Sequence, residues 1–125
     1  MYPEHIVKPM KEELTSNGFS ELKNNDDIKD LIKSGTSVIV VNSVCGCAAA
    51  NARPGILESL QNEKLPNNLF TVFAGVDKEA TESARSLMFP FPPSSPCIAL
   101  FKDGSLVHML AVSYTHLTLP TKRIV

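Results

Sequence analysis

The sequence has few of the features that mark membrane, secreted or nucleic-acid-binding proteins. No stretch approaches the roughly 20 apolar residues of a membrane-spanning helix, and the N-terminus has no basic segment followed by an apolar one. The net charge of −1 provides no basic surface for nucleic acid or an anionic membrane. We therefore expect a soluble, cytoplasmic protein that binds neither nucleic acid nor membrane.

Cysteine is also scarce. The chain contains 3 cysteines, which cannot all pair within one chain, so at least one thiol must be free. In a reducing cytoplasm a disulfide is more often catalytic or transient than structural. The 125 residues are 43% hydrophobic and 20% charged, a balance typical of one globular domain whose core needs no disulfides.

Hydrophobic patterning predicts alternating helices and strands. Helices are expected over residues 4–16, 26–33, 45–63 and 79–87, and strands over residues 36–43, 69–76, 97–102 and 106–110. Pro9 predicts a kinked or delayed start of the first helix, and Pro54 predicts a kink in the third. Asp77 is expected to cap the fourth helix.

The order of these elements predicts the fold class. The β-branched run at residues 38–41 is typical of a strand buried on both faces of a parallel sheet, and Asp103-Gly104 is a hairpin signal. The proline-rich residues 89–96 predict a loop or extended connection. We therefore expect an α/β fold in which a parallel βαβ unit joins an antiparallel hairpin, giving a mixed sheet flanked by helices.

Two cysteines lie at the predicted junction of a buried strand and a helix. Cys45, Gly46 and Cys47 follow the strand over residues 36–43 and begin the helix. Backbone N–H groups and the positive end of the helix dipole converge there, which favours a nucleophilic thiolate at Cys45. Short cysteine spacings occur in redox sites, in metal sites and in turns with unreactive thiols, so the spacing alone leaves all three open.

Longer sequence segments resemble a known family. The motif VNSVCGCAA at residues 41–49, followed by NARPG at 51–55 and PPSSP at 92–96, is similar to the bacilliredoxin family over roughly residues 1–110. The resemblance implies a thioredoxin-like fold. It also implies a thiol-disulfide oxidoreductase that removes bacillithiol from S-bacillithiolated proteins, with protein disulfide isomerase or thioredoxin-like reductant activity as the alternative.

The resemblance also implies the roles of individual residues. Cys45 corresponds to the nucleophile, Cys47 to the resolving thiol and Pro96 to the cis-proline of thioredoxin-like proteins. We expect Gly46, Ser95 and Pro96 to be the substrate-binding residues. A cis peptide between Ser95 and Pro96 would present backbone groups to an extended substrate, and Gly46 also relaxes the tight ring that a disulfide across one residue would close. Bacillithiol is then a co-substrate, S-thiolated client proteins are the partners, and no bound cofactor is expected.

Four nearby residues are possible accessories, each with a plainer interpretation. Asn42 and Ser43 are positioned to donate hydrogen bonds near the thiolate, or they simply end the strand. Arg53 would attract an acidic thiol such as bacillithiol, although an ordinary solvated helix charge is the simpler account. Cys97 is either a small buried hydrophobic residue or a third redox thiol.

Two other classes of function compete with the oxidoreductase. A metal-binding module would use Cys45, Cys47 and Cys97, alone or with a histidine, because thiolates suit Zn²⁺, Cu⁺ and iron–sulfur clusters. No fourth ligand occurs at a recognisable spacing, so we expect no metal. A redox-sensing interaction protein would be modified at Cys45 without releasing a reduced client.

The resemblance ends near residue 111. Family members resemble one another in continuing into an amphipathic C-terminal helix, whereas residues 112–125 are rich in threonine, contain Pro120 and show no helical period. We expect a thioredoxin-like domain over residues 1–111 and a non-native tail over residues 112–125, which resembles a translated adapter. Without the C-terminal helix, an apolar face of the sheet would be exposed and the protein marginally stable; a cooperative unfolding transition with a high midpoint would contradict this.

Overall fold

The computed structural model of the 125-residue chain describes residues 3–44, 52–61, 65–89 and 96–111. Within these ranges, strands form one sheet in the order β1-β3-β2-β4-β5. β3 is parallel to β1 and β2, whereas β4 is antiparallel to β2 and β5. The predicted mixed sheet is confirmed. The strands are β1 (Ser20–Glu21), β2 (Thr36–Asn42), β3 (Asn68–Phe73), β4 (Cys97–Lys102) and β5 (Ser105–Ala111).

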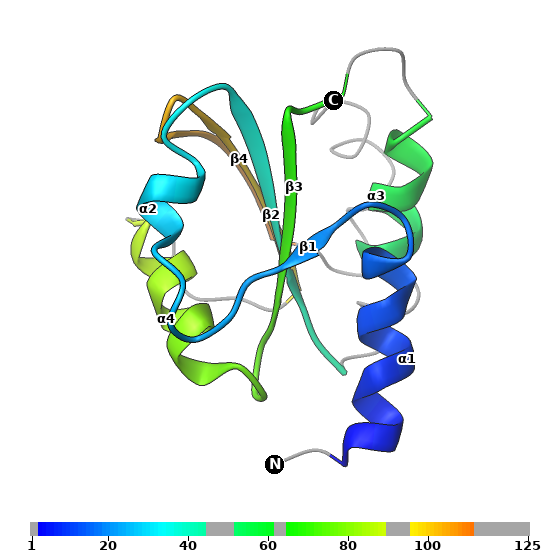
Figure 1. The fold of residues 1–125 in the computed structure, drawn as a ribbon. Coiled ribbons are helices and arrows are strands. Elements are labelled where there is room, and N and C mark those ends of the chain that lie inside the picture. The colour runs from blue at the N-terminus through cyan, green and yellow to red at the C-terminus, as the bar shows by residue number, and fades with distance from the viewer. Residues whose placement is uncertain (1–2, 45–51, 62–64, 90–95, 112–125) are drawn as a thin grey trace.

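Helices cover the two faces of this sheet (Figure 1). Helices α1 and α3 lie on one side, and α2 and α4 lie on the other. None of the helices within the described ranges is long and apolar enough to cross a membrane. The helices are α1 (Glu4–Thr15), α2 (Ile28–Leu31), α3 (Arg53–Ser59) and α4 (Lys78–Ser86).

The central strand β2 contributes to both halves of the core, because successive side chains point to opposite faces of a sheet. Ile39 and Val41 pack in the cluster that includes residues of α2 and α4. Val38 and Val40 pack in a second cluster with residues of α1 and α3. All four side chains are 0% exposed, as the β-branched run predicted for a strand buried on both faces.

Helix α1 includes Pro9 and begins before it, so the prediction of a start delayed by the proline is wrong. The carbonyl of Pro3 accepts hydrogen bonds from the N–H groups of Ile6 and Val7, at 3.1 and 3.2 Å, which forms the first turn. The helix ends as predicted beside Gly18, whose φ of +97° belongs to the left-handed region that glycine adopts most readily.

Two local predictions differ from the structure. β1 was not predicted, because two residues are too short to show strand periodicity. Residues 45–51, over which the third helix was predicted to begin, lie outside the described residues, so the kink at Pro54 stays a prediction. Asp77 precedes α4, but its side chain makes no capping hydrogen bond.

Asp77 instead pairs with a lysine of α1. Lys11 Nζ lies 2.8 Å from Glu21 Oε1 and 3.2 Å from Asp77 Oδ2, so one ammonium joins α1 to β1 and to the start of α4. Partial burial alone would lower the pKa of Lys11, but the hydrogen bonds and charges of the two carboxylates outweigh it. The pKa is therefore raised above its ordinary value of 10.5.

We expect the ion pairs of Lys11 with Glu21 and Asp77 to make the free energy of unfolding decrease at alkaline pH. A lysine whose pKa is raised by folding stabilises the protein fully below its unfolded pKa, and that contribution disappears as pH rises through the folded pKa. Urea unfolding should show Lys11→Met to be less stable than the unmodified chain at pH 8, with a smaller difference at pH 11. Lys8→Met, which changes an exposed lysine of the same helix, is the control. A difference for Lys11→Met that is the same at both pH values would contradict the prediction.

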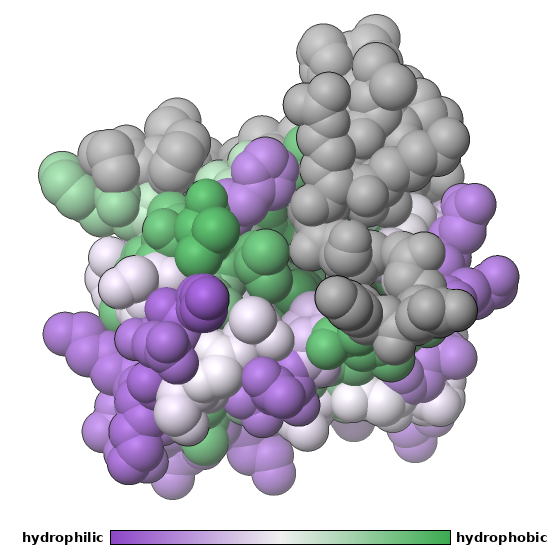
Figure 2. Space-filling view, turned by 90° about the horizontal axis from the view of Figure 1, so that it is seen from above, coloured by the Kyte–Doolittle hydropathy of each residue, from purple (hydrophilic) through white to green (hydrophobic). Residues whose placement is uncertain are grey.

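Some large apolar side chains reach the surface. Figure 2 looks at the end of the molecule where β2 and β3 begin and shows hydrophobic residues exposed there. Leu31 and Leu65, which precede these strands in the chain, are 40% and 46% exposed. The proposed non-native tail, residues 112–125, lies outside the described residues, so its character and the loss of a covering helix stay predictions.

Candidate functional site

The predicted site segments adjoin each other in the sheet. β2 and β4 are antiparallel neighbours, and Val41 near the carboxyl end of β2 is the register partner of Cys97 at the start of β4. The segment that follows β2 and the segment that precedes β4 therefore meet the sheet at the same edge. Cys45, Gly46, Cys47 and Ser95 lie outside the described residues, so their roles stay predictions, as does a cis peptide before Pro96. Pro96 itself is buried.

A buried arginine contacts the carboxyl end of β2. Arg53, the first residue of α3, is 2% exposed, so the prediction of a solvated helix charge is wrong. Its Nη1 donates hydrogen bonds to Asn42 Oδ1 at 2.9 Å and to the carbonyl oxygen of Ser43 at 3.1 Å. Its Nε donates to Glu13 Oε2 at 2.9 Å. Burying a guanidinium is costly unless its donors have partners, and these bonds supply partners for Nε and Nη1.

Asn42 joins three elements at the end of β2. The side chain is 1% exposed, and its Nδ2 donates to the carbonyl oxygen of Met10 in α1 at 3.1 Å. Its Oδ1 accepts from Arg53 and from the backbone N–H of Ser43, the latter at 2.9 Å. The amide thus links β2 to α1 and α3, which is a structural role beyond ending the strand. The backbone N–H of Ser43 is directed at Asn42 Oδ1.

Cys97 occupies the apolar core. It is 0% exposed and packs in the cluster that includes Val41 and Ala99 on the α2 and α4 side of the sheet. A fully buried cysteine packed among apolar side chains fills space as a small hydrophobic residue does. The position favours the packing interpretation of Cys97 over a third redox thiol.

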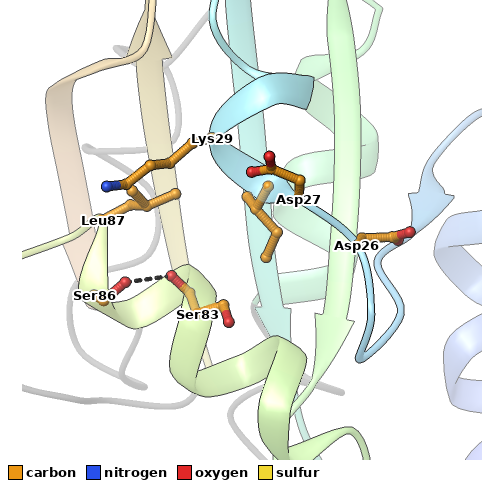
Figure 3. A pocket seen from close by; sticks show the side chains of 7 residues that line it. Asp26, Asp27, Lys29, Ser83, Ser86 and Leu87 are labelled. Carbon is orange, nitrogen blue, oxygen red and sulfur yellow. Dashed lines mark hydrogen bonds between the residues drawn. The ribbon is translucent and has the colours of Figure 1, made fainter.

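Two surface hollows are separate from this edge of β2. One of about 200 Å³ lies between α2 and α4, where Lys29 and Asp27 project near Ser83 and Ser86 (Figure 3). The Ser86 hydroxyl donates to the Ser83 carbonyl at 2.7 Å, so this donor is already satisfied within the helix. The other, of about 500 Å³, lies along α1 beside Lys11. Among the described residues that line these hollows there is no cysteine.

The described residues contain no group of three or more histidine, cysteine or acidic side chains arranged to hold a metal ion. Cys45 and Cys47 fall outside that search. The thiolate metal site considered from the sequence therefore has no support from the part of the chain that the structure describes.

Known proteins match most of the chain. A family model described as Disulphide isomerase matches residues 2–117. A bacilliredoxin of Cytophaga hutchinsonii is 59% identical over 111 residues, which cover 88% of this chain and 82% of the relative. A bacilliredoxin of Halalkalibacterium halodurans is 49% identical over 111 residues, 87% of this chain and 77% of the relative.

Solved structures agree on the fold. A putative oxidoreductase with a thioredoxin fold superimposes with a TM-score of 0.60 at 12% identity, covering 78% of this chain and 86% of that protein. Mitochondrial thioredoxin 3 of Saccharomyces cerevisiae gives a TM-score of 0.57 at 22% identity, covering 80% and 87%. The thioredoxin-like fold and the family resemblance are confirmed. Together with the relatives' names they support a thiol-disulfide oxidoreductase, and the chain belongs to the bacilliredoxin family.

Proposed function

We propose that this protein removes bacillithiol from S-bacillithiolated client proteins, with Cys45 as the nucleophile and Cys47 as the resolving thiol. The observation that carries the proposal is the arrangement of β2 and β4. The Cys45-Gly46-Cys47 segment follows β2, and Ser95-Pro96 directly precedes its neighbour β4. One edge of the sheet thus has the two segments that thiol exchange needs: a nucleophile and a backbone surface for an extended substrate.

The chemistry proceeds by two exchanges. The Cys45 thiolate attacks the bacillithiol sulfur of the mixed disulfide, the old S–S bond breaks, and the client leaves as a thiolate that takes up a proton. Cys45 then carries bacillithiol through a new S–S bond. Attack by Cys47 on the Cys45 sulfur releases bacillithiol and leaves a Cys45–Cys47 disulfide, which an external thiol must reduce. Attack by a second bacillithiol instead gives bacillithiol disulfide and restores the Cys45 thiol.

The single residue between the cysteines makes a long-lived Cys45–Cys47 disulfide unfavourable. A disulfide across one residue closes a tight ring that fits poorly with the preferred Cα separation and S–S torsion. Such strain makes an internal disulfide easy to reduce. A Cys45–Cys47 reduction potential as low as that of thioredoxin, about −270 mV, would contradict this part of the mechanism.

The test compares three substrates at equal concentration: one client carrying bacillithiol, the same client carrying glutathione, and a protein with scrambled disulfides. We expect the client thiol to be released about tenfold faster from the bacillithiol-modified client than from the glutathione-modified one. A tenfold difference corresponds to only about 1.4 kcal/mol of free energy between the two substrates. Release is followed by titration of the client thiol, with bacillithiol as the reductant. Equal rates for the two modified clients would contradict bacillithiol specificity while leaving thiol exchange intact.

Disulfide isomerisation is the second candidate, favoured by the description of the matching family. It uses the same Cys45 attack but on a disulfide between two client cysteines, and Cys45 is regenerated when a client thiol displaces it. Faster recovery of the scrambled protein than of the bacillithiol-modified client would favour this function. Under either function, the proposed place of action is the cytoplasm and the proposed partners are client proteins.

A further inference from the structure

The arginine behind the site has features that a packing role alone does not require. Arg53 keeps a full positive charge at 2% exposure, although an apolar residue of similar volume could fill the same space without that cost. Its contacts converge on the last part of β2, through the Asn42 side chain and the Ser43 carbonyl. The charge is therefore held at one defined point of the fold.

That point is close to the start of the segment that carries the reactive thiol. Ser43 precedes Cys45 by two residues, and two residues of chain span at most about 7 Å. Arg53 Nη1 lies 3.1 Å from the Ser43 carbonyl oxygen. In a region shielded from water, a charge at such a range acts more strongly than an exposed one.

We infer that Arg53 is a positioning residue that favours the thiolate of Cys45, through a buried positive charge fixed behind the carboxyl end of β2 by Asn42, Ser43 and Glu13. The inference rests on the proposed role of Cys45 as the nucleophile. It adds a second source of thiolate stabilisation to the helix dipole, one supplied by a side chain outside the cysteine motif. Arg53 touches neither substrate nor reacting atoms in this account.

The charges around Arg53 determine whether its surroundings favour or disfavour the Cys45 thiolate. Among the described residues, Glu13 of α1 is the charged group that contacts Arg53, and β2 presents the neutral Asn42 and Ser43. Lys11 of the same helix is directed at Glu21 and Asp77. Glu13 is 46% exposed, so water screens its charge more than that of Arg53, and the pair retains a net positive influence at the strand end.

The test measures alkylation of Cys45 against pH in three proteins: the unmodified chain, Arg53→Met and Glu13→Gln. Cys45 is identified by peptide mapping after brief exposure to iodoacetamide. We expect Arg53→Met to move the midpoint of the profile to higher pH by roughly 0.5–1 unit, the order of magnitude expected for removal of a nearby unit charge. Glu13→Gln keeps an acceptor for Arg53 Nε but removes the opposing charge, so its midpoint should move to lower pH.

Opposite shifts support the inference, because general loosening of the site would move both midpoints in one direction. Shifts in the same direction, or a folded Arg53→Met with an unchanged midpoint, would overturn it. Arg53→Lys retains the charge and should restore the midpoint at least in part. If Arg53→Met fails to fold, the Glu13→Gln profile decides, since an unchanged or higher midpoint overturns the inference. These profiles need no bacillithiol, so failure of the proposed function appears separately as absent transfer from the modified client.

Discussion

Replacing Cys45 with alanine is expected to abolish release of bacillithiol from a modified client, whereas replacing Cys47 leaves the first transfer intact. Only Cys45 makes the initial attack in the proposed mechanism, and no other group replaces a missing nucleophile. Cys47→Ala should transfer one bacillithiol per protein molecule and then depend on added bacillithiol for further turnover. Thiol release in single-turnover and multiple-turnover experiments measures the two steps separately.

Cys97→Ala is the matched control for these variants. It removes the third thiol while keeping a small apolar side chain in the core position that the structure assigns to Cys97. Its transfer rate should equal that of the unmodified chain. Loss of transfer in Cys97→Ala with the fold intact, or normal transfer in Cys45→Ala, would contradict the assignment of roles.

Replacing Phe101 with alanine is expected to destabilise the domain severely. Phe101 is 0% exposed in β4 and packs in the cluster between the sheet and helices α2 and α4. Truncating a buried phenylalanine costs about 3–5 kcal/mol, a large part of the roughly 5–15 kcal/mol by which a domain is stable. Urea unfolding followed by circular dichroism measures the loss.

Phe89→Ala provides the same chemical change at the surface. Phe89 follows α4 and is 80% exposed, so its truncation should change the free energy of unfolding by less than about 0.5 kcal/mol. Equal losses for the two variants would show that the core cluster around Phe101 does not determine stability as the fold indicates.

The sequence predicts most of the sheet because its signals are local. The run at residues 38–41 in β2 is β-branched and wholly apolar, and the hairpin between β4 and β5 turns at Asp103-Gly104. Both turn residues have positive φ, 49° and 84°, as a type I′ hairpin turn requires. β1 could not be predicted, because its two residues form a strand only by pairing with Phe70 and Thr71 of β3.

The burial of Arg53 could not be predicted from its own surroundings in the sequence. Its partners are 40 residues away at Glu13 and 11 away at Asn42, so nothing local distinguishes it from a solvated helix arginine. One signal was available: Asn42 directly follows the apolar run at residues 38–41 of a buried strand, and a buried amide requires hydrogen-bond partners. That signal predicts a polar network without identifying its members.

The network also gives helix α1 a role at the site. Met10 and Glu13 of α1 contact Asn42 and Arg53, so the N-terminal helix is joined by hydrogen bonds to the strand end that leads to the cysteines. This connection depends on residues outside the segments that carried the family resemblance. The site is thus supported by an element that the motif alone does not include.

The most direct test of thiol exchange at Cys45 is a single mass measurement. The reduced protein is exposed briefly to a bacillithiol-modified client, quenched with acid, and analysed by intact mass and peptide mapping. We expect a mass increase of one bacillithiol, located on Cys45, together with release of the client thiol. Bacillithiol found only on Cys47 or Cys97, or no transfer to a protein shown by circular dichroism to be folded, would contradict it.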